Sequence, residues 1–330
     1  MERKRQRNGV VENNHSNKKR KLRNKIRTTN TKFRSRFEDL ANEILYEIFE
    51  YLDIYHVYRL FFDLNKRFKN LLIDSNHSIQ INVSPMSKSN FEHYYNDIIL
   101  SNKHRINYFR LSNPFTVDIV FSPPRIITKF VRLETLIFDN IDAKYLHNIL
   151  NQSIHLTKLH SLVLNLIGRV QDPDKLFFYI FRLPILKYFK ITCDTKESLY
   201  LEVNFDKCKT SSIEHLVINC GFVTHSFNDL LLHLPKLRYL SISSLVGYPY
   251  ENLKLSHILL KDFKYISLNI YNVLFNGFEL LVKHYFRSIE VLRITTRMDQ
   301  SYLDAKRWEQ LILSSMPNLL VFDFKHDNHV

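Results

Sequence analysis

Three cysteines and two C-terminal histidines are the side chains best suited to redox or metal chemistry in this chain of 330 residues. Cys193, Cys208 and Cys220 form no C-x-x-C pair, so their spacing predicts neither a zinc site nor a disulfide framework. His326 and His329, in "HDNH", have no third ligand near them in the sequence. We therefore expect no metal and no cofactor. Cys193 and Cys220 are interpreted as small core groups or turn-stabilising donors, and a regulated thiol stays as the alternative.

The motifs of several enzyme classes are missing from the sequence. Because the chain has five glycines, it contains neither G-x-G-x-x-G nor G-x-x-x-x-G-K-[ST], the loops that hold phosphates. The motifs H-E-x-x-H and G-x-S-x-G are missing as well. We therefore expect a protein that binds other molecules and is not an enzyme.

The net charge of +14 lies almost entirely in an N-terminal tail. Residues 1–36 contain fourteen Lys and Arg against two Glu, and the rest of the chain carries 33 basic and 31 acidic residues. A nearly neutral folded part argues against a nucleic-acid-binding face, since phosphate contacts need clustered Lys and Arg. We expect residues 1–36 to be a disordered basic tail, and nucleic acid to be bound weakly at most, through that tail.

Two basic clusters in the tail resemble a bipartite nuclear localisation signal: Lys4 and Arg5, then Lys18, Lys19, Arg20 and Lys21. The alternative is a solubilising or weakly RNA-binding arm. The odd number of cysteines indicates a reducing compartment. No apolar run reaches the ~18 residues of a membrane span, so we expect an intracellular protein of the nucleus and/or cytoplasm that does not enter a membrane.

A six-residue pattern of apolar-x-x-apolar-x-apolar recurs from residue 106 onward, and it predicts a series of short strands. The nine segments start 24 to 30 residues apart: "INYFRL", "LETLIF", "LHSLVL", "LKYFKI", "IEHLVI", "LRYLSI", "FKYISL", "IEVLRI" and "LLVFDF". Residues that can cap the start of a helix lie between several of them. They are Asp172, which is followed by Pro173, and also Ser226 and Asp304. A period of this length is typical of stacked repeats.

The phrase "LPxLxxLxL" in these units resembles ribonuclease-inhibitor-like leucine-rich repeats. The resemblance covers residues 106–330 and implies a solenoid of about nine units with a concave binding face. It departs from the family in one respect: the Asn or Cys that the family has after the third apolar residue of the strand comes one residue sooner here, as at Cys193 and Cys220. Strand alternation then predicts a substrate-binding row of Tyr108, Arg110, Tyr188, Lys190, His215, Tyr239, Tyr265 and Arg293. Ordinary solvated strand positions are the alternative.

Residues 37–72 place apolar side chains at helical spacing ahead of the repeats, in helices expected over 42–52 and after Asp53. This stretch resembles an F-box, the module that joins substrate receptors to a Skp-type adaptor of cullin-RING ubiquitin ligases. Leu40, Glu43, Ile44, Leu45, Ile48, Phe49, Leu52, Leu60 and Phe68 match the adaptor-binding positions of the family. Ala41 replaces the family's proline, and Phe68 replaces its tryptophan. The alternative is that the apolar stripe only packs within the chain.

Together these patterns predict an α/β solenoid: a small helical F-box followed by ribonuclease-inhibitor-like leucine-rich repeats. Residues 73–105 join the two parts, with a strand expected at 79–83 and a helix at 89–100. The resemblance implies a receptor that binds a Skp-type adaptor, and through it a cullin, and that holds an unknown protein substrate. The main alternative is a nuclear leucine-rich-repeat scaffold without a ligase, and a third is an RNA-associated factor acting through its tail.

Overall fold

The protein was analysed as a computed structural model that describes residues 36–73, 77–83, 87–112, 114–121, 127–193, 200–247 and 260–327. The basic clusters of the tail lie outside the described residues. The chain divides into two compact units between Phe49 and Glu50, inside the segment 37–72. In the first unit, a short 3-10 turn, η1 (Phe37–Asp39), precedes α2 (Asn42–Glu50), whose last residue belongs to the second unit.

In the second unit, the described residues include eleven strands that form one parallel sheet. Its order is β1-β2-β3-β4-β5-β7-β8-β9-β10-β11, and β6 pairs with the end of β7. Apart from β6, each strand therefore lies beside its neighbours in the sequence. The strands are β1 (Ile79–Asn82), β2 (Ile106–Leu111), β3 (Thr135–Asp142), β4 (Ser161–Ile167), β5 (Tyr188–Cys193), β6 (Tyr200–Leu201), β7 (His215–Val223), β8 (Tyr239–Val246), β9 (Tyr265–Tyr271), β10 (Val291–Thr296) and β11 (Val321–His326).

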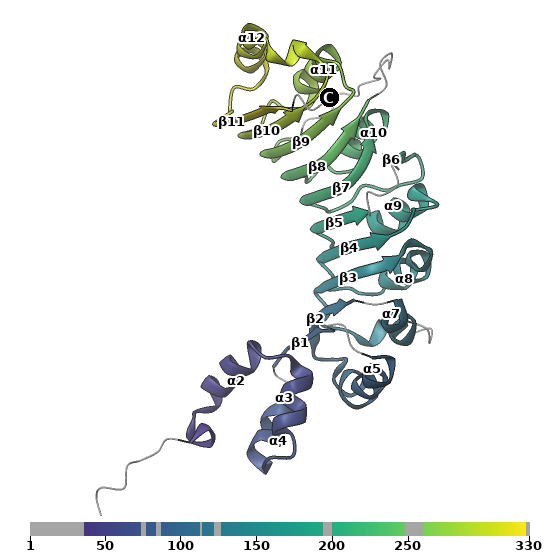
Figure 1. The fold of residues 1–330 in the computed structure, drawn as a ribbon, viewed down its shortest axis with the longest axis vertical. Coiled ribbons are helices and arrows are strands. Elements are labelled where there is room, and N and C mark those ends of the chain that lie inside the picture. The colour runs from purple at the N-terminus through teal and green to yellow at the C-terminus, as the bar shows by residue number, and fades with distance from the viewer. Residues whose placement is uncertain are drawn as a thin grey trace, which may run out of the picture. The chain divides into compact units, whose positions relative to one another are not determined.

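Helices cover one face of this sheet, as α7 to α10 show in Figure 1. Two helices, α3 (Ile54–Phe61) and α4 (Lys66–Ile73), precede the first strand. A continuous helical segment follows it as α5 (Lys88–Tyr94), the π-helical turn η2 (Tyr95–Ile99) and α6 (Leu100–Asn102). The other helices are α7 (Pro114–Phe121), α8 (Leu146–Ser153), α9 (Pro173–Phe181), α10 (Thr224–Leu232), α11 (Phe275–Tyr285) and α12 (Ala305–Ser315), with 3-10 turns η3 (Ile127–Lys129), η4 (Ala143–Tyr145) and η5 (Gln300–Leu303).

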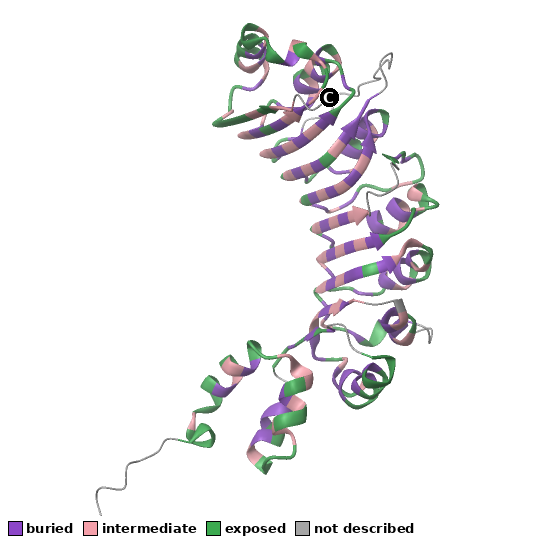
Figure 2. Ribbon diagram, viewed as in Figure 1, coloured by how far each residue is buried: buried purple, intermediate pink, exposed green. Residues whose placement is uncertain are grey.

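Alternation of apolar residues places the core between the sheet and the helices. In β4, Leu162, Leu164 and Leu166 are buried while the residues between them are half-buried. Figure 2 shows the same banding along the neighbouring strands. Successive side chains of a strand point to opposite faces, so a period of two buries one row of residues under the helices. The other row lies on the opposite face, which no helix of the described residues covers; it is called the helix-free or open face.

The predicted fold class is wrong. It was an α/β solenoid with a small helical F-box followed by about nine ribonuclease-inhibitor-like leucine-rich repeats. The structure instead has a single eleven-stranded, all-parallel sheet with helices, an α/β fold. The sheet already includes β1, so no separate repeat domain begins at residue 106. The connections also differ: among the described residues between β5 and β7 there is β6 and no α-helix.

An aromatic cluster fills the core beside that connection. Phe205 lies between β6 and β7 and is fully buried. Its ring centroid is 5.5 Å from that of Phe177 and 5.6 Å from that of Phe181, both in α9. The large Phe205 ring thus packs against α9 and adds to the core within a connection that has no described α-helix of its own.

Side-chain caps set the start of several helices. Asp172 Oδ1 accepts from Lys175 N–H at 2.9 Å before Pro173, and Asp304 Oδ1 accepts from Lys306 N–H at 3.0 Å, which confirms both predicted helix starts. The cap expected at Ser226 is wrong. Ser226 is buried inside α10, and its hydroxyl bonds both the N–H and the C=O of Val203 at 2.9 Å.

Helices α3 and α4 are joined to the sheet's first strands by a buried polar network. Tyr58 donates its hydroxyl to the Leu72 carbonyl at 2.9 Å, and the Arg105 guanidinium donates to the same carbonyl at 2.7 Å. Arg105 also donates to Asn102 Oδ1 at 3.0 Å and to the His77 carbonyl at 3.1 Å. A buried guanidinium is stable only with such partners, so this network sets the packing of the predicted junction 73–105.

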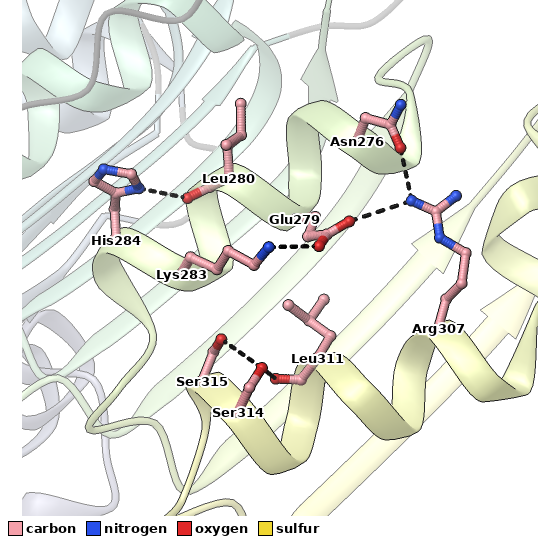
Figure 3. A network of polar contacts seen from close by, with 9 residues as sticks. All are labelled: Asn276, Glu279, Leu280, Lys283, His284, Arg307, Leu311, Ser314 and Ser315. Atoms are coloured by element: carbon pink, nitrogen blue, oxygen red, sulfur yellow. Dashed lines mark hydrogen bonds and ion pairs between the residues drawn. The ribbon is translucent and has the colours of Figure 1, made fainter.

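A second polar network joins the last two helices (Figure 3). Arg307 of α12 donates to Asn276 Oδ1 at 2.6 Å and to Glu279 Oε2 at 3.2 Å, both in α11. Lys283 donates to Glu279 Oε1 at 2.6 Å, and the Arg307 guanidinium lies 4.1 Å from the ring centroid of Phe275. These contacts fix α12 against α11 beside the last strands of the sheet.

Candidate functional site

The helix-free face of the sheet brings the predicted substrate-binding residues together. Strand register places Tyr108, Tyr188, His215, Tyr239 and Tyr265 on one row. Arg110, Lys190 and Arg293 lie on the next row, two residues further along their strands. All eight are half-buried or exposed. A parallel sheet usually has both faces covered, so a face left uncovered and lined with aromatic side chains is a candidate binding surface.

Neighbouring rings stack along the first row. The ring centroids of Tyr239 and Tyr265 are 4.3 Å apart, with 9° between the planes. His215 continues the stack, with its centroid 5.7 Å from that of Tyr239 and 23° between the planes. At the other end the Arg293 guanidinium lies 5.7 Å from the Tyr265 centroid. The stack limits the ring rotamers before any partner binds, which lowers the entropy cost of binding.

An ion pair at the other end of the face includes a residue that the sequence analysis missed. Arg110 donates its Nε–H to Asp139 Oδ2, and Asn165 donates to Asp139 Oδ1 at 2.6 Å. The hydrogen bond to Asp139, assisted by one to Tyr108, raises the pKa of Arg110 against the opposing effect of burial. Asp139 stands two residues after Ile137 in β3, so both side chains belong to the helix-free face. Strand alternation was the signal that could have found it.

A shallow polar depression of about 300 Å³ lies on the same face, across β8 to β11. Hydroxyl, amide and charged groups line most of it: Ser241, Ser243, Ser267, Asn269, Arg293, Thr295, Asp323 and Lys325. Arg293 and Asp323 are 3.8 Å apart across it. Within the part of the chain that the structure describes, Lys190 has no acidic partner. The face therefore offers aromatic edges, hydroxyl groups and an unneutralised lysine, a set suited to a polypeptide.

The predicted adaptor-binding residues divide by exposure. Leu45 and Phe49 of α2 and Phe68 of α4 are buried, and the ring of Phe68 packs 5.4 Å from that of Phe61. Leu40 and Ile48 are half-buried. Four residues are exposed: Glu43, Ile44, Leu52 and Leu60. The exposed ones are available to a partner, and the buried ones shape the helices that carry them.

Local capping explains why α3 and α4 begin where they do. Asp53 Oδ1 accepts from Tyr55 N–H at 2.8 Å at the predicted turn, and Asn65 Oδ1 accepts from Phe68 N–H at 3.0 Å. The predicted set also missed exposed apolar residues, among them Leu64, just before α4, and Ile73, the last residue of α4. They extend the apolar surface of this part of the second unit.

The described residues contain neither a cluster of metal ligands nor a helix that could cross a membrane. No group of three or more His, Cys, Asp or Glu side chains there could hold a metal ion. No helix in those ranges is long and apolar enough to cross a membrane. No protein-family model matches the chain, and no curated protein matches it either.

Proposed function

We propose that this protein is a substrate receptor of a cullin-RING ubiquitin ligase. Residues 37–72 bind a Skp-type adaptor and through it a cullin, and the helix-free face of the sheet binds a protein substrate. The chain has no catalytic residue in this mechanism. Its contribution is proximity, because holding a substrate beside the ligase raises the effective concentration of the reacting lysine.

Exposed apolar side chains on short helices are the observation that carries the adaptor site. Ile44 in the first unit is 43% exposed, and Leu60 in the second is 63% exposed. Leu52, Leu64 and Ile73 are exposed too. Within each unit, large apolar side chains left uncovered favour contact with a partner, since exposed apolar surface is commonly an interaction site. The resemblance of residues 37–72 to an F-box identifies the partner class.

The substrate site is supported by the stacked row on the open face. Tyr and Arg dominate the energetics of many interfaces, and Tyr239, Tyr265 and Arg293 form one continuous cluster. A polypeptide that lies across the strands reaches these rings and the polar depression together. Recognition of a protein, without chemistry on it, fits this set of side chains.

The basic tail and the free cysteines support a place of action inside the cell. Residues 1–36 carry the two basic clusters, and Cys193, Cys208 and Cys220 are free thiols. We place the protein in the nucleus and/or cytoplasm, with the tail serving nuclear import. Fusion of residues 1–36 to a fluorescent protein tests the tail: nuclear accumulation is expected, and its persistence after Lys18, Lys19, Arg20 and Lys21 are changed to Ala would contradict this assignment.

Bridging by the full chain tests the proposed assembly. The chain, a purified Skp-type adaptor and a cullin are mixed and analysed by sedimentation velocity. We expect a complex that contains all three proteins. A receptor role is contradicted if the adaptor and cullin sediment together while the folded chain sediments alone. In that case a binding protein without a ligase link, acting through its open face, is the function left.

A further inference from the structure

Strand β11 ends the sheet, and among the described residues no strand pairs with its outer backbone edge. It pairs with β10, and no described strand lies on its other side. The N–H groups of Val321 and Asp327 donate to the carbonyls of Glu290 and Thr296, both at 3.0 Å. Backbone groups alternate sides along a strand, so those of Phe322, Phe324 and His326 point to the free edge. Figure 1 shows this strand at the end of the sheet.

Apolar side chains around this edge are exposed where the matching positions of other strands are buried. Phe322 is in register with Leu292, and Leu292 with Ile266. Leu292 and Ile266 are fully buried, whereas Phe322 is exposed. Leu320 is 79% exposed and Leu313, on α12, is 77% exposed. An edge strand with this much apolar surface is a site at which another strand adds.

The charged residues of β11 indicate which strand pairs with its free edge. We propose that β11 pairs antiparallel with β11 of a second copy of this chain, with Phe324 opposite Phe324. This register sets Asp323 opposite Lys325 of the other copy, and the same contact repeats on the other side of the two-fold axis. A register centred on Asp323 opposes two carboxylates, and one centred on Lys325 opposes two ammonium groups. Like charges directly opposite destabilise a strand pair, so the register centred on Phe324 is favoured over these two.

The same register satisfies the free backbone groups. Phe322 stands opposite His326 and Phe324 opposite itself, and all three residues point their N–H and C=O groups to the edge. Such pairs exchange two hydrogen bonds each in an antiparallel ladder. Asp323 already lies 3.8 Å from Arg293, and Lys325 lies 2.7 Å from Asp327. The side chains of Asp323 and Lys325 are themselves 66% and 69% exposed, so both charged groups can also contact the second copy.

The proposed pairing brings two binding faces into one assembly. A two-fold axis perpendicular to the sheet joins two sheets into one and keeps both open faces on the same side. Two binding faces then act on one partner, which raises the apparent affinity for any repeated or dimeric ligand through effective concentration. The inference does not depend on the ligase role, because it rests on β11 and α12 alone.

Charge reversal and charge exchange test the proposed dimer. Sedimentation velocity of the full chain over a series of concentrations measures its dissociation constant. Lys325→Asp opposes two carboxylates and should raise this constant by about tenfold or more. The double change Asp323→Lys with Lys325→Asp restores opposite charges and should restore the dimer. Lys190→Asp, on the same face but away from the edge, is the matched control and should leave the constant unchanged.

Three results would overturn the proposal: a wild-type chain that stays monomeric, a dimer unaffected by Lys325→Asp, or a double variant no tighter than Lys325→Asp. Thermal unfolding of each variant is measured alongside. If Lys325→Asp does not fold, Asp323→Lys tests the same contact by opposing two ammonium groups. A dimer that survives Asp323→Lys unchanged contradicts the proposal equally.

Discussion

Tyr239 and Tyr265 stack face to face on neighbouring strands, with 4.3 Å between their ring centroids and 9° between their planes. Directly opposed residues on adjacent strands are the closest side chains across a sheet, so the register of β8 with β9 produces this contact. The pair lies toward the C-terminal end of the open face, on β8 and β9. It is therefore both a stabilising contact and part of the candidate substrate site.

A double-mutant cycle measures this stack. We expect Tyr239→Ala and Tyr265→Ala to show a coupling energy of about 0.5–1.5 kcal/mol in the free energy of unfolding, because each change removes the partner of the other ring. Urea unfolding supplies the four values. Tyr188 and Tyr265 lie on the same row without contact, and their cycle is the control. Equal coupling in both cycles would show that stacking is not its source.

The buried network around Arg105 should dominate the stability of the first strands. Arg105→Met leaves the Leu72 carbonyl and Asn102 without their strongest donor, so we expect the free energy of unfolding to fall by about 3 kcal/mol. Denaturant unfolding measures it. Arg238→Met removes an exposed ion pair with Glu214 and should cost less than about 1 kcal/mol. If the two losses were equal, burial of Arg105 would have no special role.

The carboxylate of Asp299 links α11 to the turn before α12. It accepts from Phe275 N–H at 2.8 Å and from Ser301 N–H at 2.9 Å. Burial alone would raise the pKa of Asp299, but hydrogen bonds from Phe275 and Ser301, with the charge of Arg307, lower it overall. Because the folded-state pKa is lowered, this stabilisation is fully present above the unfolded pKa of about 3.9 and is lost as the pH falls below it.

Asp299→Asn tests this link. We expect the variant to be less stable than the wild type by about 1 kcal/mol at pH 7, and this difference to be smaller at pH 3, on the acid side of the unfolded pKa. Thermal unfolding at the two pH values measures the change. Asp262→Asn, in an exposed turn, is the control. A difference that stays constant with pH would contradict a role for the charge.

The three thiols should differ in reactivity. A hydrogen bond with Cys220 lowers the pKa of Cys193 against the effect of burial, and the same bond together with burial raises the pKa of Cys220. Burial and the charge of Asp174 raise the pKa of Cys208 to about 11. The thiolate is the reactive form, so iodoacetamide at pH 8 should modify Cys193 first. Mass spectrometry of the peptides gives the order, and faster modification of Cys208 would refute it.

Local patterns in the sequence predicted the strands and many of the candidate site residues. Each of the nine repeated segments overlaps a strand, and the eight residues chosen by outward parity lie on two adjacent rows of the open face. Both results follow from the two-residue period of a strand. Asp172 and Asp304 were predicted as caps because a cap bonds only to the next few residues.

Features that depend on distant contacts were not predicted. Ser226 looks like a helix cap, yet its hydroxyl bonds the backbone of Val203 across the chain. Asp139 is fixed by Arg110 and Asn165, which belong to other strands. The fold class was wrong for the same reason: the period of the segments shows that strands recur, but not that β1 joins them in one sheet.

Binding of a purified Skp-type adaptor to the full chain, measured by calorimetry, is the most direct test of the ligase proposal. We expect binding that Ile44→Asp and Leu60→Asp each weaken by at least about tenfold, because a carboxylate would be buried in an apolar interface. Leu280→Asp is the matched control: Leu280 is 44% exposed on α11, close to the 43% of Ile44. Circular dichroism confirms folding of every variant. Absence of binding by the folded wild type, or equal loss with Leu280→Asp, would contradict the account.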